Sequence, residues 1–325
     1  MNDKNQIVAG TSPDVITFGE SMALLLPEGN KGIEYSPTLE CTFGGAESNV
    51  AIGIARLGHQ VGWFSQLGED PIGTIIVKTL RGEGVDVSRV HRISEAGTGI
   101  MMREVVAGQT SVYYYRRSSA ASLMSYGLLD ESYIAGARIL HVTGITTALS
   151  KSARQTVIEA VRLARKHAVK VSFDPNLRLK LWSIEEAREV LLPLAAEADY
   201  FLPGLDELKL LYATEDVDVI FGKLQELNNT CVVKGGDNVT YLIEQGTVTP
   251  VPYYRVDRII DTVGAGDAFC AGFLSGLLRG YSHEEAVRLG NLLGSMVIQT
   301  EGDWQGLPTA AQVEAKLNAK VHVER

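Results

Sequence analysis

From residue 138 onward, short apolar β-type segments alternate with longer segments that repeat apolar residues at helical spacing. Parallel strands need a crossover connection, usually a helix, and such helices cover both faces of the sheet. The alternation therefore predicts an α/β fold with a doubly wound, mostly parallel sheet. Strands are expected at Ile139–Val142, Val169–Phe173, Tyr200–Leu202 and Thr230–Lys234, and helices at Lys151–His167, Ile184–Ala196, Val217–Asn228, Ala265–Arg279 and His283–Thr300.

The first third of the chain combines the same alternation with two hairpins. Its regular elements are expected as strands at Val15–Gly19 and Val61–Leu67 and as helices ending at Leu57 and Gly82. The β-type runs Met22–Pro27, Gly99–Val106 and Ser111–Arg117 border turn-forming residues instead. We interpret them as a small β-sheet lid. One domain is expected at 14–310, with lid segments at about 22–42 and 98–118 and tails at 1–13 and 311–325.

Composition and charge narrow the classes of function. The 325 residues carry a net charge of −9, which disfavours a nucleic-acid-binding protein. Three widely spaced cysteines predict neither a disulfide framework nor a zinc site. The first residues contain no apolar signal-peptide core, and no apolar run is long enough to cross a membrane. We therefore expect a cytoplasmic protein that binds neither nucleic acid nor membrane.

The segment DTVGAGDAF, residues 261–269, carries the strongest chemical signal. Gly264, Ala265 and Gly266 precede an apolar helical pattern, so they are expected at a helix N-terminus, where free N–H groups bind anions. Asp267 would be unfavourable beside an anion unless it acts on the ligand. We interpret it as a base that takes a proton from a nucleophile while the N–H groups hold a phosphoryl group. Neither a Walker A loop nor a GxGxxG motif is present, which argues against an NAD-dependent enzyme.

Three further segments offer polar groups for a ligand. The double glycine of GGAESN allows close backbone approach and Asn49 can bind hydroxyls. DPNLR follows a predicted strand at the sheet edge where ligands bind, and YYYRR lies on a lid strand with tyrosine and arginine on one face. Arginine binds carboxylates in a bidentate manner. The candidate substrate-binding residues are Gly44, Gly45, Asn49, Tyr114, Arg116, Asp174, Asn176 and Arg178.

GGAESNVAIGIARLG and DTVGAGDAFCAGFL together resemble the two signature segments of the ribokinase-like (PfkB) carbohydrate kinases, over about residues 14–310. The resemblance implies transfer of the γ-phosphoryl group of ATP to a sugar hydroxyl, with Asp267 as base and residues 264–266 as the anion hole. It also implies magnesium, with Glu207 acting on the ion through water. The nucleotide would contact Lys234, Gly236, Asp237, Gly264, Gly266 and Asn291.

Within this family, the segments Tyr114–Ala120 and Asp174–Trp182 resemble 2-keto-3-deoxygluconate kinases. That resemblance implies phosphorylation of a sugar acid, 2-keto-3-deoxygluconate, to its 6-phosphate, with Tyr114, Arg116 and Arg178 at the substrate. Two positions depart from the pattern: Met101 stands where many of these kinases have a tyrosine, and Gly204 stands where the family often has asparagine.

Other readings stay open. A kinase for a neutral sugar such as fructose or ribose would share the fold and the base, and a non-catalytic sugar sensor would need neither base nor anion hole. Relatives imply a monovalent cation such as K+ near Asp261 and Gly302. A lid with exposed edges also predicts a homo-oligomer formed through the lid.

Overall fold

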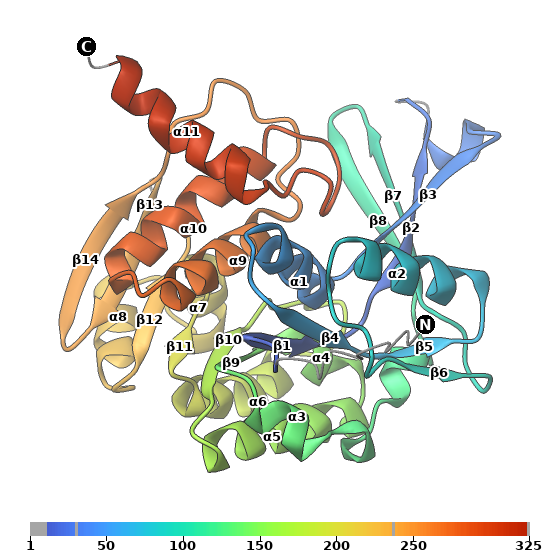
Figure 1. The fold of residues 1–325 in the computed structure, drawn as a ribbon, viewed down its shortest axis with the longest axis horizontal. Coiled ribbons are helices and arrows are strands. Elements are labelled where there is room, and N and C mark those ends of the chain that lie inside the picture. Colours follow the sequence, from blue (N-terminus) through green and yellow to red (C-terminus); the bar gives the residue numbers. More distant parts are fainter. Residues whose placement is uncertain (1–11, 30–31, 236–237, 324–325) are drawn as a thin grey trace, which may run out of the picture.

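The computed structural model describes residues 12–29, 32–235 and 238–323 (Figure 1). At its centre is an eight-stranded sheet, in the order β14 (Thr247–Pro252), β13 (Val239–Glu244), β12 (Thr230–Val233), β11 (Tyr200–Phe201), β10 (Lys170–Asp174), β9 (Ile139–Thr143), β1 (Val15–Phe18) and β4 (Val61–Phe64). The strands from β12 to β4 are parallel, and only the β13–β14 edge is antiparallel. This confirms the predicted doubly wound α/β fold.

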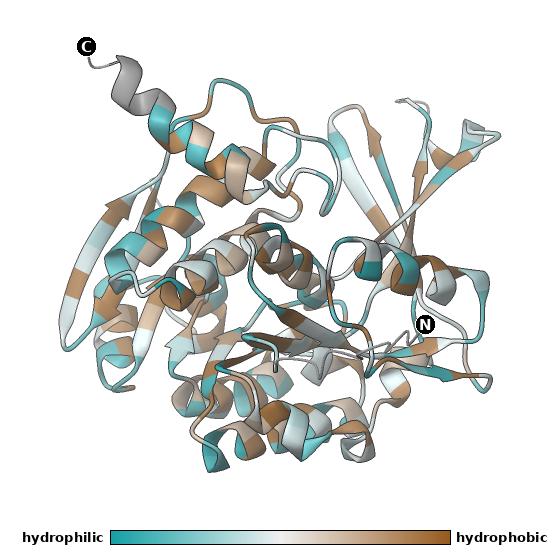
Figure 2. Cartoon of the chain, viewed as in Figure 1, coloured by the Kyte–Doolittle hydropathy of each residue, from teal (hydrophilic) through white to brown (hydrophobic). Residues whose placement is uncertain are grey.

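Helices cover both faces of this sheet. One apolar core lies under α1 (Ala46–Arg56), α2 (Pro71–Gly82), α9 (Ala265–Leu278), α10 (His283–Val297) and α11 (Ala310–Val323). The other lies under α3 (Glu131–Ala135), α4 (Gly144–Leu149), α5 (Lys151–Lys166), α6 (Ile184–Glu197), α7 (Leu205–Tyr212) and α8 (Val217–Gln225). Figure 2 shows hydrophobic residues recurring in the central strands and along the helices beside them, so both faces of the sheet are packed.

Strand order reverses next to β1. The chain runs from β1 to β4 on one side, and β9 through β12 follow on the other side. In open α/β sheets, ligands bind in the crevice beyond the carboxyl ends of the strands at such a reversal. The fold therefore places a ligand site beyond the ends of β1, β9 and β10.

A smaller sheet projects beside this crevice, at the upper right of Figure 1. Its order is β3 (Leu39–Gly44), β2 (Met22–Pro27), β7 (Ile100–Val106) and β8 (Gln109–Tyr115). β2 and β7 pair in parallel, so they join the two segments expected to form the lid. Another pair, β5 (Gln66–Gly68) and β6 (His91–Ile93), forms a separate two-stranded sheet, and short 3-10 helices lie at Ile33–Tyr35, Ala120–Leu123 and Tyr126–Leu128.

Some elements differ from the sequence expectation. The single strand expected at Val61–Leu67 is divided, because β4 joins the central sheet and β5 pairs with β6. The β13–β14 hairpin, turned by Gln245 and Gly246 at positive φ, and the short helices α3, α4 and α7 were not anticipated. Most of the C-terminal segment expected as a tail forms α11, whose Val313 is buried in the core. In the described part of the chain, no helix is long and apolar enough to span a membrane.

Candidate active site

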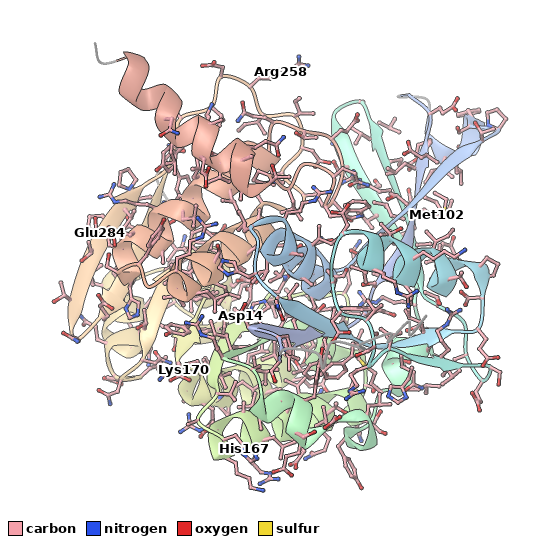
Figure 3. The ribbon with its side chains drawn as sticks, in the orientation of Figure 1. Asp14, Met102, His167, Lys170, Arg258 and Glu284 are labelled. Carbon is pink, nitrogen blue, oxygen red and sulfur yellow. The ribbon has the colours of Figure 1, made fainter. Side chains whose placement is uncertain are left out.

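A cavity of about 370 Å³ occupies the crevice between the two sheets. Eleven of the twelve predicted catalytic and substrate-binding residues line it, and they come from all four motifs; Ala265 lines the adjoining cavity instead. His167 and Glu284, which belong to none of these motifs, lie at the outer surface in Figure 3. Folding thus brings together segments that are more than 200 positions apart.

The turn before α9 has the geometry of an anion site. Gly264 is the N-cap residue, with φ of 77°, and a Cβ atom there would lie 2.2 Å from the carbonyl oxygen of Asp303. Only glycine fits that position. Within the described chain, the N–H groups of Gly264 and Gly266 have no protein acceptor, and that of Ala265 reaches the Thr262 carbonyl at 3.4 Å. These N–H groups and the dipole of the 14-residue helix favour an anion.

Asp267 lies in the first turn of the same helix and is held in place by a hydrogen bond from Asn49. The Asn49 Nδ2 group donates to Asp267 Oδ2 at 2.8 Å, which links the two signature segments directly. The carboxyl group faces the cavity but lies deep in the protein, and burial raises its pKa to about 7. The carboxylates of Asp174 and Asp303 contribute to this rise in pKa, while Asn49 and Arg178 oppose it. Its pKa suits a group that accepts a proton near neutral pH.

Asp174 and Lys234 form a buried ion pair at 2.7 Å beside that base. Burial disfavours the ammonium, but the Asp174 carboxylate raises the pKa of Lys234 above its usual value, so the side chain stays charged. The other Asp174 oxygen accepts the backbone N–H of Asn176 at 3.1 Å. Asp174 was expected at the substrate, and the structure engages both of its oxygens inside the protein.

Arg116, on the lid side of the cavity, forms an ion pair with the buried carboxylate of Glu20, which also accepts the Ser119 hydroxyl. The guanidinium lies 5.5 Å from the ring centre of Tyr114. The sequence reading took Arg116 as free for a ligand and missed Glu20. In contrast, Arg178 makes only a hydrogen bond to the Leu177 carbonyl within the described chain. Arg178 is therefore the more available cation.

Comparison with known proteins agrees with this geometry. A protein-family model described as pfkB family carbohydrate kinase matches residues 12–310. The chain belongs to this family. The 2-dehydro-3-deoxygluconokinase of Bacillus subtilis (strain 168) is 38% identical, over 94% of this chain and 96% of its own length. Fructokinase-1 of Oryza sativa subsp. japonica is 30% identical, over 94% of this chain and 98% of its own.

A solved structure of a 2-dehydro-3-deoxygluconokinase from Thermotoga maritima is also similar. It shares 28% identity and a TM-score of 0.83, and the match covers 93% of this chain and 97% of that one. The family resemblance and the expected sugar kinase are thus confirmed. The roles of individual residues still rest on the geometry.

The expected nucleotide side of this pfkB-family chain adjoins the anion turn. A cavity of about 310 Å³ shares Lys234 and Gly266 with the first cavity and is lined by the aromatic residues Tyr253, Tyr254 and Phe269. Asn291 lines it as well, but its side chain already bonds Thr240 and the carbonyls of Val251 and Pro252. Gly236 and Asp237 lie outside the described residues.

Glu207 has both carboxylate oxygens engaged by the backbone. Oε1 accepts the Leu177 N–H at 2.6 Å and Oε2 accepts the Gly204 N–H at 2.7 Å, so the side chain closes the turn that begins α7. Burial and the nearby Asp174 carboxylate raise its pKa. Within the described residues, no group of three acidic, histidine or cysteine side chains could hold a metal ion. Mg²⁺ commonly binds through substrate phosphates and waters with few protein ligands, which is compatible with this set.

An ion pair that the sequence reading missed joins the lid to the anion turn. Arg103, on lid strand β7, contacts Asp261 at 2.9 Å, and the other Asp261 oxygen accepts the Val263 N–H at 3.1 Å. Asp303 lines the same cavity; burial raises its pKa to about 6, while the Arg103 guanidinium lowers it and the Asp261 carboxylate raises it. Arg103 therefore neutralises carboxylates behind the turn.

Replacement of Arg103 by methionine is expected to lower kcat about 10- to 100-fold, because a charge-assisted hydrogen bond between largely buried groups contributes roughly 1.5–3 kcal/mol. Asp261→Asn should lower kcat less once Arg103 is already methionine. Kinetics of the two single variants and the double variant measure this coupling. Fully additive effects would mean that the pair does not act as a unit.

Proposed function

We propose that this protein transfers the γ-phosphoryl group of ATP to the terminal hydroxyl of 2-keto-3-deoxygluconate, the sugar acid that 2-dehydro-3-deoxygluconokinases are named for. The supporting observation is the order of groups along the two adjoining cavities. An aromatic pocket, the anion turn with Asp267, and the cations Arg116 and Arg178 follow one another. A nucleotide, a reacting hydroxyl and a carboxylate require this order.

Each group has a defined task in that reaction. Asp267 accepts the hydroxyl proton on the carboxylate oxygen that Asn49 leaves free. The N–H groups of the turn hold the transferring phosphoryl group, and Lys234 adds positive charge between the two cavities. Mg²⁺, bound mainly by ATP phosphates with Glu207 acting through water, would neutralise phosphate charge. Phosphoryl transfer depends mostly on such positioning and charge stabilisation.

The substrate end is formed by Arg178, Tyr114 and the Arg116–Glu20 pair. Arg178 is expected to bind the carboxylate of the acid, and the Tyr114 hydroxyl to assist. Because Met101 lines the cavity where a hydroxyl donor is common among these kinases, fewer donors reach the acid. A kinase for a neutral sugar such as fructose is the second candidate, favoured by the pairing of Arg116 and by the similarity to a fructokinase.

The two candidates are separated by an ADP-release assay over 2-keto-3-deoxygluconate, gluconate, fructose and ribose. Arg178→Met should raise KM for the acid at least about tenfold, since one hydrogen bond between charged groups contributes roughly 1.5–3 kcal/mol. KM for fructose should change little. Arg116→Ala is a poor probe, because it would leave Glu20 buried without its cation. Greater activity on fructose than on the acid would contradict the proposed substrate.

Activity is expected to rise with pH through about 7. The base must be ionised to accept a proton, and the pKa of Asp267 is raised to about 7 by burial. The logarithm of kcat/KM should therefore increase below this pH and level off above it. Stopped assays between pH 5.5 and 9 measure the profile. A flat profile from pH 5.5 upward would exclude Asp267 as the titrating base.

We also propose a homo-oligomer formed through the lid. Tyr113 and Tyr115 of β8 and Val105 and Val106 of β7 are exposed on this small sheet. Light scattering at micromolar concentration distinguishes a dimer from a monomer.

A monovalent cation such as K+ near Asp261 is a separate proposal, and a titration of kcat with K+ tests it. Asp261 already forms an ion pair with Arg103.

A further inference from the structure

A larger cavity of about 1120 Å³ lies outside the substrate end of the site. It shares Val112, Tyr114, Arg116 and Arg178 with the first cavity, so these residues form the boundary between the two. Its remaining wall comes from Thr110 of β8, the chain after β8, the end of α4, the start of α5 and the segment 177–181. We call it the basic vestibule, for the charges that line it.

The vestibule is strongly cationic, whereas the whole chain has a net charge of −9. Arg117, Lys151 and Lys180 line it together with Arg116 and Arg178, and none of the described lining residues is acidic. Only Arg116 has a carboxylate partner among the described residues. Arg117 and Lys151 are exposed, and Lys180 lies 5.6 Å from the ring centre of Tyr114.

A helix terminus adds to this positive potential. α5 is 16 residues long and begins at Lys151, and its N-cap Ser150 accepts the Ala153 N–H at 3.0 Å. Ser150 and Ser152 line the vestibule, so the positive end of the helix dipole faces it. Side-chain charges and backbone dipole therefore have the same sign at one opening.

We propose that the basic vestibule is the entry site for the anionic end of the acceptor and lowers KM for sugar acids relative to neutral sugars. This rests on the proposed sugar-acid kinase. Charges lining a cleft raise the local concentration of a ligand of opposite sign, and salt screens exposed charges over about 10 Å at 0.1 M. The aromatic nucleotide cavity shares none of the vestibule residues, so ATP binding is not expected to respond.

The test removes Arg117 and Lys151, which belong to the vestibule wall and not to the reacting site. The variant Arg117→Gln/Lys151→Gln is compared with Arg81→Gln/Lys316→Gln, which removes one exposed arginine and one exposed lysine elsewhere. Both variants have the same net charge. At 20 mM salt, KM for 2-keto-3-deoxygluconate should rise about three- to tenfold in the first variant only, and the difference should vanish near 0.5 M salt. In that variant, kcat and KM for ATP should stay unchanged.

Equal KM changes in the two variants, a change that persists at high salt, or the same change for fructose would overturn the proposal.

Failure of the proposed function would give a different experimental result. In that case wild-type protein phosphorylates a neutral sugar and no sugar acid. The vestibule is then tested with gluconate as a competitive inhibitor. Its inhibition constant should rise in the Arg117→Gln/Lys151→Gln variant at low salt, and an unchanged constant would overturn the proposal.

Discussion

Asp267→Asn is expected to lower kcat by about 10²–10⁴, because a positioned general base contributes a factor of this size. The asparagine amide keeps the shape of the carboxyl group, and its oxygen can still accept the bond from Asn49 Nδ2. Nucleotide binding should persist. Initial rates of ADP release with saturating acceptor measure the loss. Asp206→Asn, at an exposed position of α7, serves as the matched control and should retain activity.

The same variant is expected to be more stable than wild type above pH 7. Burial raises the pKa of Asp267 to about 7 in the folded state, whereas an unfolded aspartate titrates at about 3.9. Between these values the folded protein holds a proton that the unfolded chain has released, so the contribution of this group to stability falls as pH rises. Above pH 7 the carboxyl group is ionised in both the folded and the unfolded state, so the full free-energy cost of burying its charge remains. Urea unfolding at pH 4.5 and 8 should show a gain for asparagine that grows with pH. In the activity assay, a kcat of Asp267→Asn near the wild-type value would show that Asp267 is not the base.

Lys234→Met is expected to reduce the free energy of unfolding by about 3–5 kcal/mol, since loss of one partner leaves a buried charge uncompensated. The remaining carboxylate of Asp174 lies beside Glu207 and Asp267, so the pKa of Asp267 should rise and the pH profile should shift upward. Denaturant unfolding and the pH dependence of kcat/KM measure the two effects.

A matched control exists on the surface. Lys170 and Asp199 are also 2.7 Å apart, but the lysine side chain is 56% exposed, compared with 18% for Lys234. Exposed ion pairs contribute roughly 0–1 kcal/mol, so Lys170→Met should cost little. The double variant Lys234→Met/Asp174→Asn should recover part of the lost stability. Similar losses from the buried and the exposed pair would contradict the role assigned to burial.

Much of the fold was predictable because its helices and strands are periodic. The strand–helix alternation predicts the central sheet, and glycine-rich segments at helix starts predict that Asn49 and Asp267 belong to the site. The structure shows that these two residues, 218 positions apart, are in direct contact. Short elements with little periodicity, such as α4 and the β13–β14 hairpin, were not predictable in this way. Their formation depends on the surfaces they cover.

The sequence did not predict which residues pair with the charged side chains of the site. No role was predicted for Glu20, Arg103 or Asp303, yet Glu20 neutralises Arg116 and Arg103 binds Asp261. These contacts join the lid to the rest of the protein, and their separations in the sequence follow no local period. An arginine in a motif therefore indicates a positive charge but not whether that charge is available to a ligand.

The contact between Arg103 and Asp261 bears on how this family can be recombined. Lid segments are attractive for exchange between relatives, because they carry Tyr114 and Arg116 and leave the base in place. In this protein, however, one lid residue is half of an ion pair whose other half belongs to the phosphoryl-binding turn. A chimera that imports a foreign lid without arginine at position 103 acquires new specificity together with an unpaired aspartate beside its anion hole. Lid and turn therefore have to be exchanged as one unit.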